Sequence, residues 1–248
     1  MVERWGPDFY TKTHLSGGSA GTIFAIGIAL GKSPKYLDDM YRQVALKSHV
    51  HGPVHNASVF TEDAVKLILE DPMAYKQLEG KCCFGTTEFF SKHRWHVSWS
   101  DNDDLLDCIQ ASYHIPFYCQ RNKGIKNIHV VDGAYGFAGP NLPHGDETLY
   151  VGIDPHAEIT RTYTYPQMML PAVGKEYDDM VRSGYEAFMK WDGVTMIKKV
   201  DNRTPNYEAL YFLWFLKFWE VIFYGFVSLF RHVFALIIAL VNVARIRQ

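Results

Sequence analysis

The fold is decided by residues 11–31, which read TKTHLSGGSAGTIFAIGIALG. The first five residues suit a short β-strand, and the six small residues after them suit a tight turn. An unbroken apolar run then covers 22–30 and ends at Gly31, as expected of a buried helix. This stretch therefore predicts a strand, a tight turn and a helix, with Ser19 at the corner between them.

The corner carries the pattern G-x-S-x-G, formed by Gly17, Gly18, Ser19, Ala20 and Gly21. In this arrangement the serine sits on a strained strand-to-helix turn, and side chains at the flanking glycine positions would clash. The serine hydroxyl is then exposed above the sheet, and the helix N-terminus with the Ala20 amide faces a developing oxyanion. Ser19 is the candidate nucleophile, and a glycine-rich turn with a passive serine is the alternative.

Strand and helix patterns alternate along the rest of the chain, which favours a layered α/β fold. Helices are predicted at 35–47, 61–70, 103–113 and 175–191, and strands within 81–99 and at 128–131 and 148–153. A different composition begins after the last of these helices. We therefore predict a globular domain at 1–192 and a hydrophobic helical segment at 205–248.

Bulk composition limits the classes of function. A net charge of −2 offers no basic surface for nucleic acid, so we expect no nucleic-acid partner. Hydrophobic residues make up 48% of the chain and charged residues 21%, which excludes a disordered protein. However, 12 of the 37 aromatic residues lie between Tyr207 and Phe234. The average composition therefore leaves membrane binding open.

Nothing in the pattern of cysteines, histidines or glycines indicates a metal or a cofactor. The chain has no C-x-x-C pair among its four cysteines, which are Cys82, Cys83, Cys108 and Cys119. His49, His51 and His55 flank Gly52-Pro53, where a solvated loop is expected, and no phosphate-binding or dinucleotide-binding pattern occurs. We expect no metal, no cofactor, and reduced thiols in an intracellular compartment.

From residue 207 onward nearly every residue is apolar. The stretch 221–244 is long enough to cross a bilayer, which takes about 20 apolar residues, and it is interrupted once, by Arg231-His232. Polar residues nevertheless recur at helical spacing on one narrow stripe, formed by Lys217, Glu220, Tyr224, Ser228 and Arg231. Such a stripe is typical of a helix lying in a membrane interface. We predict membrane association, whether spanning or lying flat; a helical pair buried against the domain is the alternative.

Several motifs beyond the G-x-S-x-G corner, taken together with it, resemble those of a known protein family. Asp132-Gly133-Ala134 follows a short apolar strand, and Asn141-Leu142-Pro143 lies beyond it. Between the corner and this strand stand DDLLDCIQAS at 103–112 and IPFYC at 115–119. Together with the G-x-S-x-G corner, these segments resemble the patatin-like phospholipase family, in particular its animal-type branch of triacylglycerol lipases. The resemblance covers residues 11–191 and excludes the hydrophobic segment.

The resemblance implies a three-layer α/β/α fold and a Ser–Asp dyad without a catalytic histidine. Ser19 would attack an ester carbonyl and form an acyl-enzyme, with Asp132 as the base. Gly133 and Ala134, being small, would let the loop that carries Asp132 approach the serine corner; an ordinary turn at a strand end is the alternative. The implied substrates are acylglycerols or phospholipids at a membrane or lipid-droplet surface, with the endoplasmic reticulum or the lipid droplet as the expected location.

One part of the family pattern differs in this chain. The family has a first strand and a glycine-rich oxyanion loop before the serine, whereas residues 1–14 contain one glycine, Gly6. The Ala20 amide then remains as donor, and losing one such donor costs roughly 2.7–4 kcal/mol. We expect an N-terminally incomplete chain. Two other functions stay open: an inactive or weakly active membrane-bound lipid-binding protein, and a Ser–His–Asp esterase using His144 or His156.

Overall fold

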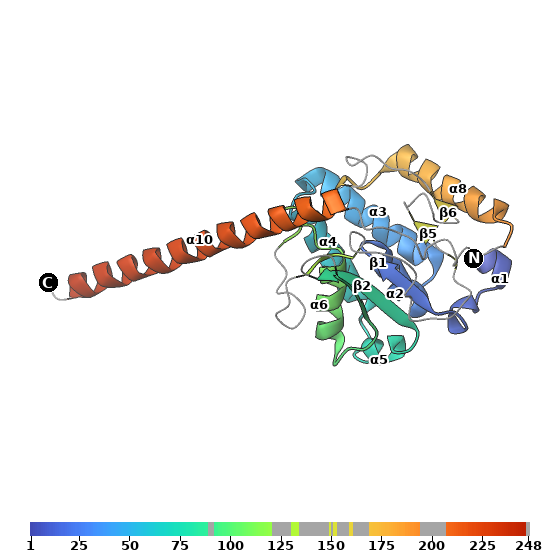
Figure 1. Cartoon of the computed structure of the whole chain (residues 1–248), viewed down its shortest axis with the longest axis horizontal. Helices are drawn as coiled ribbons and strands as arrows, with labels where there is room; N and C mark the ends of the chain where they lie inside the picture. The colour runs from blue at the N-terminus through green and yellow to red at the C-terminus, as the bar shows by residue number, and fades with distance from the viewer. Residues whose placement is uncertain are drawn as a thin grey trace.

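The structure is a computed structural model, and it describes residues 1–88, 92–120, 130–133, 149, 151–152, 159–160, 169–193 and 207–246. Within this part of the chain there are eight α-helices, a four-stranded mixed β-sheet and a two-stranded sheet, and the last of the eight helices projects from the body (Figure 1). The elements are α1 (Val2–Trp5), a 3-10 turn η1 (Phe9–Thr11), β1 (Leu15–Gly18), α2 (Gly21–Ala29), α3 (Pro34–His51), α4 (Asn56–Ile68), α5 (Ala74–Leu78), β2 (Cys82–Glu88), β3 (Lys92–His96), α6 (Asn102–Ser112), β4 (Val130–Asp132), β5 (Val151–Gly152), β6 (Ile159–Thr160), α8 (Gly174–Lys190) and α10 (Tyr207–Ile246). The predicted α/β class is confirmed.

Strand β2 organises the main sheet. It pairs with β1 in parallel, from Leu15 opposite Cys82 to Gly18 opposite Gly85. It pairs with β3 and β4 in antiparallel fashion, and both of these pairings cover Thr86, Thr87 and Glu88. A strand has two edges, so β3 takes one of them while β1 and β4 share the other, end to end.

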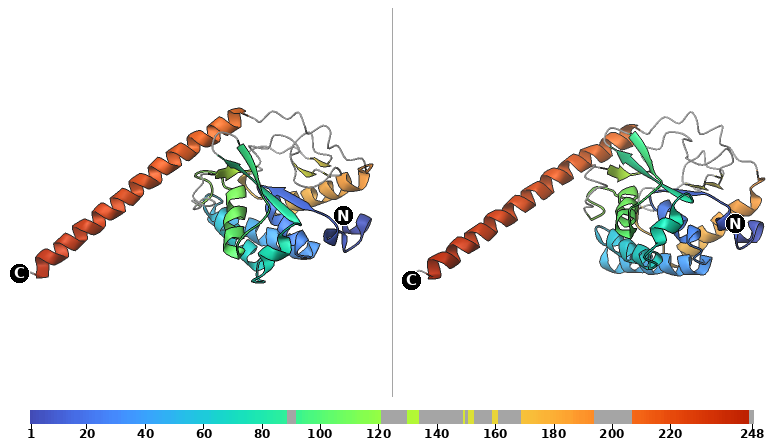
Figure 2. Two further views of the ribbon diagram at one scale, coloured as in Figure 1. Left: turned by 60° about the horizontal axis from the view of Figure 1, so that its bottom comes forward. Right: turned by 90° about the horizontal axis from the view of Figure 1, so that it is seen from below.

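One face of this sheet packs on helices. Ile26 of α2, Val65 of α4 and Ile109 of α6 are fully buried in one apolar cluster with Phe84 of β2. Most of helix α2 is buried in this cluster, although Phe24 is exposed. Helices α3 and α8 form an outer pair in which Tyr41 and Tyr177 stack with ring centroids 4.6 Å apart. Figure 2 shows α3, α4 and α5, in light blue to teal, below the strands. Three complete layers remain a prediction.

Several element boundaries differ from the prediction. The first strand is not at 11–15: residues 9–11 form a 3-10 turn, and β1 takes in both Gly17 and Gly18. Strand propensity does not predict that β1 includes these glycines, because glycine is a poor strand former. Here the close approach of α2 requires a glycine at position 17. Helix α3 extends through His49 and His51, so the loop predicted around these histidines was wrong.

The N-terminal residues pack on α8. The Trp5 ring lies edge-on to Phe188, with centroids 5.3 Å apart, and the Arg4 side chain donates a hydrogen bond to the Trp191 carbonyl at 2.9 Å. Arg4 also lies over the Trp191 ring at 4.8 Å, a cation–π contact. This segment therefore joins the start of the globular body to its last helix.

Helix α10 projects from the body as a single rod (Figure 1). In the described part of the chain it contains the one segment long and apolar enough to cross a membrane, Trp214–Ala235, of 22 residues. Most of its large side chains face outward, for example Phe230, which is 73% exposed. The helix is therefore long and apolar enough to cross a membrane, and the alternative of a buried helical pair was wrong, because the described part of α10 is a single, mostly exposed helix.

Candidate active site

The sheet register brings the two predicted reacting groups together. Strand β1 ends at Gly18, opposite Gly85, and β4 ends at Asp132, opposite the next residue, Thr86. Because β1 runs parallel to β2 and β4 runs against it, the C-terminal ends of β1 and β4 meet. Ser19 follows directly, and its Oγ donates a hydrogen bond to Asp132 Oδ2 at 2.5 Å.

Ser19 occupies a strained backbone conformation. Its φ of +55° lies in the left-handed region, which side chains with a Cβ seldom adopt. The strain is sustained by the strand before it and the helix after it, and strained residues of this kind gather at functional sites. The corner therefore has the geometry expected of a nucleophile elbow.

The two outer glycines of the motif differ in what they allow. A Cβ on Gly17 would lie 2.5 Å from the Thr22 Cα atom, so no side chain fits there. A Cβ on Gly21 would meet nothing within 4 Å. The expectation that side chains at both positions would clash is thus confirmed for Gly17 and wrong for Gly21, which is exposed at the first residue of α2.

Helix α2 begins at the corner with its N-terminus beside the serine. Ala20 is the N-cap residue and Gly21 is the first helical residue. The first N–H groups of a helix have no acceptor inside the helix, and the helix dipole makes this end positive. This arrangement can stabilise an oxyanion on a carbonyl carbon attached to Ser19, as the sequence predicts for the Ala20 amide.

Asp132 is held by its backbone rather than by an exposed loop. It is 1% exposed. Its N–H donates to the His114 carbonyl at 2.9 Å, and its carbonyl accepts from Thr87 Oγ1 at 2.8 Å. The carboxylate therefore approaches Ser19 from a buried, hydrogen-bonded strand end.

Gly133 makes this approach possible. A Cβ at this position would lie 2.0 Å from the carbonyl oxygen of Gly85, a backbone atom of the central strand. The expectation that a small residue lets the aspartate strand reach the corner is confirmed here. Ala134, the next residue of the motif, lies outside the described residues, as do His144 and His156.

Ser112 is a buried residue of the site whose role the sequence does not indicate. It is the last residue of α6, and its Oγ donates to the Gly85 carbonyl at 2.6 Å and accepts from the Ser19 N–H at 3.1 Å. Its carbonyl accepts from the Ser19 N–H at 3.2 Å and from the Gly133 N–H at 2.9 Å. Ser112 thus bonds to the backbone of Ser19 and to the backbone of Gly133, the residue that follows Asp132. Its signal in the sequence is a serine at a helix end just before Ile115-Pro116, which is too general to assign a role.

Ser112→Ala is expected to lower the unfolding free energy by about 2 kcal/mol, because buried polar groups at the corner lose their partner. Turnover of an ester substrate should fall about tenfold as the Ser19 backbone loosens. Urea unfolding and steady-state kinetics check both effects. The control is Ser48→Ala, which removes a fully buried serine hydroxyl bonded to the Val44 carbonyl in α3. Equal turnover in the two variants would contradict the role of Ser112.

Two histidines near the site, the half-buried His93 and the buried His114, have lowered pKa values. Burial lowers the pKa of His93 to about 4, although a hydrogen bond with the Gly133 backbone opposes the shift. Burial also lowers the pKa of His114, whose carbonyl holds Asp132. Burial raises the pKa of three of the cysteine thiols, Cys82, Cys83 and Cys119, to about 12, so these groups are poor nucleophiles.

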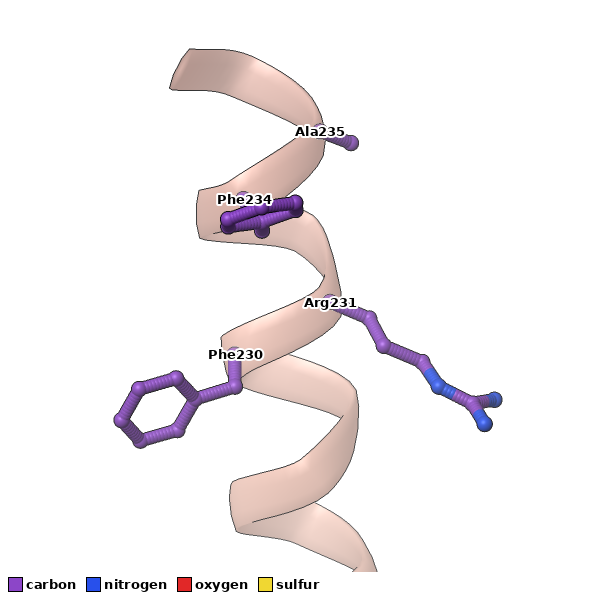
Figure 3. Close-up of a pocket in the computed structure, with 4 residues that line it drawn as sticks. All are labelled: Phe230, Arg231, Phe234 and Ala235. Atoms are coloured by element: carbon purple, nitrogen blue, oxygen red, sulfur yellow. The ribbon is translucent and has the colours of Figure 1, made fainter. Parts of the chain in front are cut away.

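No cluster of three or more metal-ligating side chains occurs in the described ranges. Away from the dyad, the surface of α10 has a shallow, mainly apolar hollow. It is lined by Phe230, Arg231, Phe234 and Ala235 (Figure 3). Phe230 and Phe234 are 73% and 66% exposed. Their exposure suits lipid contact better than the enclosure of a small molecule.

The polar stripe predicted on α10 is divided between two surroundings. Ser228 and Arg231 are exposed, as expected for an interfacial face. Lys217 and Glu220 are instead buried against the globular body, 6% and 1% exposed. Helical spacing shows that these residues share a face, but the body covers the root of that face, so the expectation of a continuous lipid-facing stripe was wrong for these two residues.

No protein-family model matches the chain, and no curated protein and no solved structure matches it either.

Proposed function

We propose that the chain is a membrane-associated lipid acyl hydrolase of the patatin-like kind. In this proposal Ser19 and Asp132 hydrolyse the carboxylic esters of acylglycerols or phospholipids. The observation that carries it is the 2.5 Å hydrogen bond between Ser19 Oγ and Asp132 Oδ2 at a strained strand-to-helix corner. A three-layer α/β/α domain at 1–192 and a membrane-associating segment at 205–248 belong to the same proposal.

The first half of the reaction forms an acyl-enzyme. Ser19 Oγ bonds to the ester carbonyl carbon while its proton passes to Asp132 Oδ2, which is already within hydrogen-bond distance. The negative charge on the carbonyl oxygen is stabilised at the N-terminus of α2. The intermediate then collapses, the bond to the alcohol oxygen breaks, and Asp132 returns the proton to the leaving alcohol.

The second half releases the fatty acid. A water molecule gives a proton to Asp132 and attacks the acyl carbon, and the collapse of this second intermediate breaks the bond to Ser19 Oγ, which recovers the proton. Both halves use the same carboxylate, so the cycle returns the enzyme to its starting protonation state. The chemistry needs neither a metal nor a cofactor.

The C-terminal helix supports a lipid substrate. Aromatic and aliphatic side chains are exposed along it, among them Phe218, Phe226 and Phe234, each at least 60% exposed. An exposed apolar surface of this kind favours insertion into a lipid surface, where acylglycerols and phospholipids are presented. We propose an intracellular membrane or lipid droplet as the site of action, with the endoplasmic reticulum as one such membrane.

A fluorophosphonate probe tests the proposal, because it reacts with activated serine hydroxyls. We expect the full chain to be labelled and peptide mapping to find the label on Ser19. Ser19→Ala should abolish labelling, whereas the control Ser183→Ala, which changes an exposed serine on α8, should label at the wild-type rate.

Two outcomes would favour the other functions. A wild-type chain that binds phospholipid vesicles but never labels would identify a lipid-binding protein without turnover. Labelling at Ser19 that is lost in His144→Gln or His156→Gln would identify a Ser–His–Asp esterase. Under the dyad, both histidine variants keep their labelling.

A further inference from the structure

Two charged side chains of α10 are buried at its root. Lys217 and Glu220 pair at 2.9 Å and are 6% and 1% exposed, whereas Phe218 and Trp219 between them are 60% and 48% exposed. Moving such a pair out of water is costly, and apolar residues of similar size hold a helix at least as well. Stability alone therefore gives no reason for this pair, and its contacts suggest another role.

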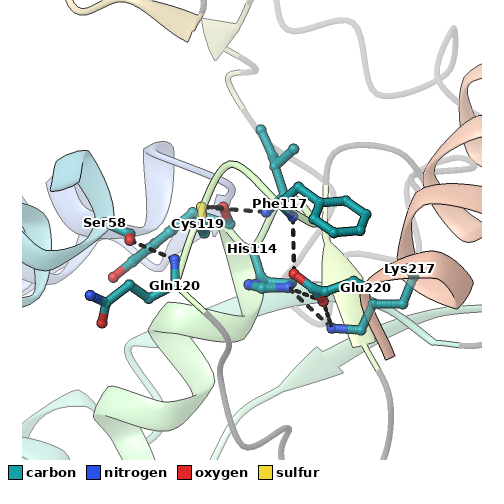
Figure 4. A network of polar contacts seen from close by, with 9 residues as sticks. Ser58, His114, Phe117, Cys119, Gln120, Lys217 and Glu220 are labelled. Carbon is teal, nitrogen blue, oxygen red and sulfur yellow. Dashed lines mark hydrogen bonds and ion pairs between the residues drawn. The ribbon is translucent and has the colours of Figure 1, made fainter. Parts of the chain in front are cut away.

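Both charges contact the segment that links α6 to the aspartate region. Glu220 Oε1 accepts the Phe117 N–H at 3.0 Å, and His114 Nε2 lies 3.1 Å from Lys217 Nζ and 3.4 Å from Glu220 Oε2 (Figure 4). Burial lowers the pKa of His114, so the ring is neutral and its Nε2 accepts from the lysine ammonium. The side chains of Lys217, Glu220 and His114 and the Phe117 N–H therefore form one network of polar contacts.

The network holds a backbone turn that Phe117 would not adopt by itself. Phe117 has a φ of +62°, in the left-handed region. Glu220 accepts its N–H, and Phe223, one turn further along α10, meets the Phe117 ring with centroids 6.4 Å apart. The root of α10 thus contacts both the backbone and the side chain of Phe117.

The opposite side of the same segment holds the dyad. The His114 carbonyl accepts the Asp132 N–H at 2.9 Å, while its imidazole meets Lys217 and Glu220. Two residues earlier, Ser112 bonds to the backbone of Ser19 and Gly133. A shift of His114 therefore moves the strand end that presents the carboxylate to the serine.

We propose that Lys217 and Glu220 are positioning residues of the hydrolytic site, acting through His114 and Phe117. They fix the 114–117 segment so that Asp132 stays in contact with Ser19. Through these contacts α10, whose exposed apolar surface would meet lipid, also positions Ser19 and Asp132. This inference rests on the proposed dyad.

A matched pair of full-chain variants tests it: Lys217→Met/Glu220→Gln and Lys217→Met/Glu220→Leu. Both remove the two charges. The glutamine oxygen can still accept from Phe117 and its amide can donate to His114 Nε2, whereas leucine can do neither. Labelling by a water-soluble fluorophosphonate is measured on detergent-solubilised protein, per folded molecule, so that membrane binding does not enter the result.

We expect the glutamine variant to label within about threefold of the wild-type rate, and the leucine variant to label about tenfold more slowly at saturating probe. The probe concentration that gives half the maximal rate should not change. If the leucine variant does not fold, Glu220→Gln alone replaces it, because its uncompensated ammonium should slow labelling relative to the glutamine double variant.

Different results overturn different claims. Equal labelling of the glutamine and leucine variants, or of the single and double glutamine variants, shows that the root of α10 does not position the dyad. A lower melting temperature with an unchanged labelling rate shows a structural role and also overturns the inference. A wild-type chain that does not label refutes the proposed function itself.

Discussion

Asp132→Asn is expected to lower the turnover of a long-chain ester about 10⁴-fold, the size of effect seen when the carboxylate of a serine-hydrolase triad is replaced by its amide. The amide cannot take the proton of Ser19 Oγ, so the nucleophile stays protonated. The backbone bonds of Asp132, to His114 and from Thr87, do not involve the carboxylate and should persist. Steady-state hydrolysis of a micellar ester, with circular dichroism to confirm folding, measures the effect.

The dyad also predicts non-additivity. Ser19→Ala should abolish turnover by itself, and Ser19→Ala combined with Asp132→Asn should be no slower, because groups that act as a unit are lost together. Asp179→Asn is the control, since it removes a half-buried α8 carboxylate paired with Lys175 and Arg182, away from the dyad, and should leave turnover unchanged. Turnover of Asp132→Asn within tenfold of the wild type would mean that another group is the base.

Gly133→Ala is expected to lower the unfolding free energy by about 3 kcal/mol or more. The added Cβ would lie 2.0 Å from the Gly85 carbonyl oxygen and 2.6 Å from its carbon. Both atoms belong to the central strand, so relief requires separating β4 from β2 and moving Asp132 away from Ser19. Urea unfolding measures the loss, and fluorophosphonate labelling of the remaining folded protein should fall with it.

Gly21→Ala is the matched control for that glycine. Its Cβ enters open space at the first residue of α2, where alanine is the better helix former by roughly 0.5–1 kcal/mol. The variant should therefore be as stable as the wild type or slightly more stable, and should keep its labelling. A Gly133→Ala protein as stable as Gly21→Ala would contradict the close approach of the two strands.

The serine corner could be predicted from sequence because its causes are local. Five consecutive residues define the turn, and the apolar run after them must be buried, so a helix there is the simplest solution. The position of Ser19 follows from these neighbours alone. The exact start of β1 did not follow, because glycine has low strand propensity and only the contact of Gly17 with Thr22 requires it.

The partner of Ser19 could be inferred only from a resemblance. Asp132 lies 113 residues further along the chain, and nothing in its own neighbours separates it from an ordinary turn. The register of β2 decides the matter, since Gly85 and Thr86 are adjacent and each faces the end of a different strand. Ser112 was missed for the same reason: its hydrogen-bond partners come from three distant segments, at the serine corner, in β2 and after β4.

The sequence by itself determined the α/β class, the serine corner and the apolar character of α10, because each depends on residues close together in the chain. Only the tertiary structure decided which strand end meets Ser19, which glycines are sterically required, and which face of α10 meets the body. Helical periodicity puts Lys217 and Glu220 on one stripe with Arg231, but it says nothing of what covers that stripe. Packing decides which part of the stripe is covered. Lys217 and Glu220 can be buried because His114 and the Phe117 amide bond to them, which offsets part of the cost of removing their charges from water.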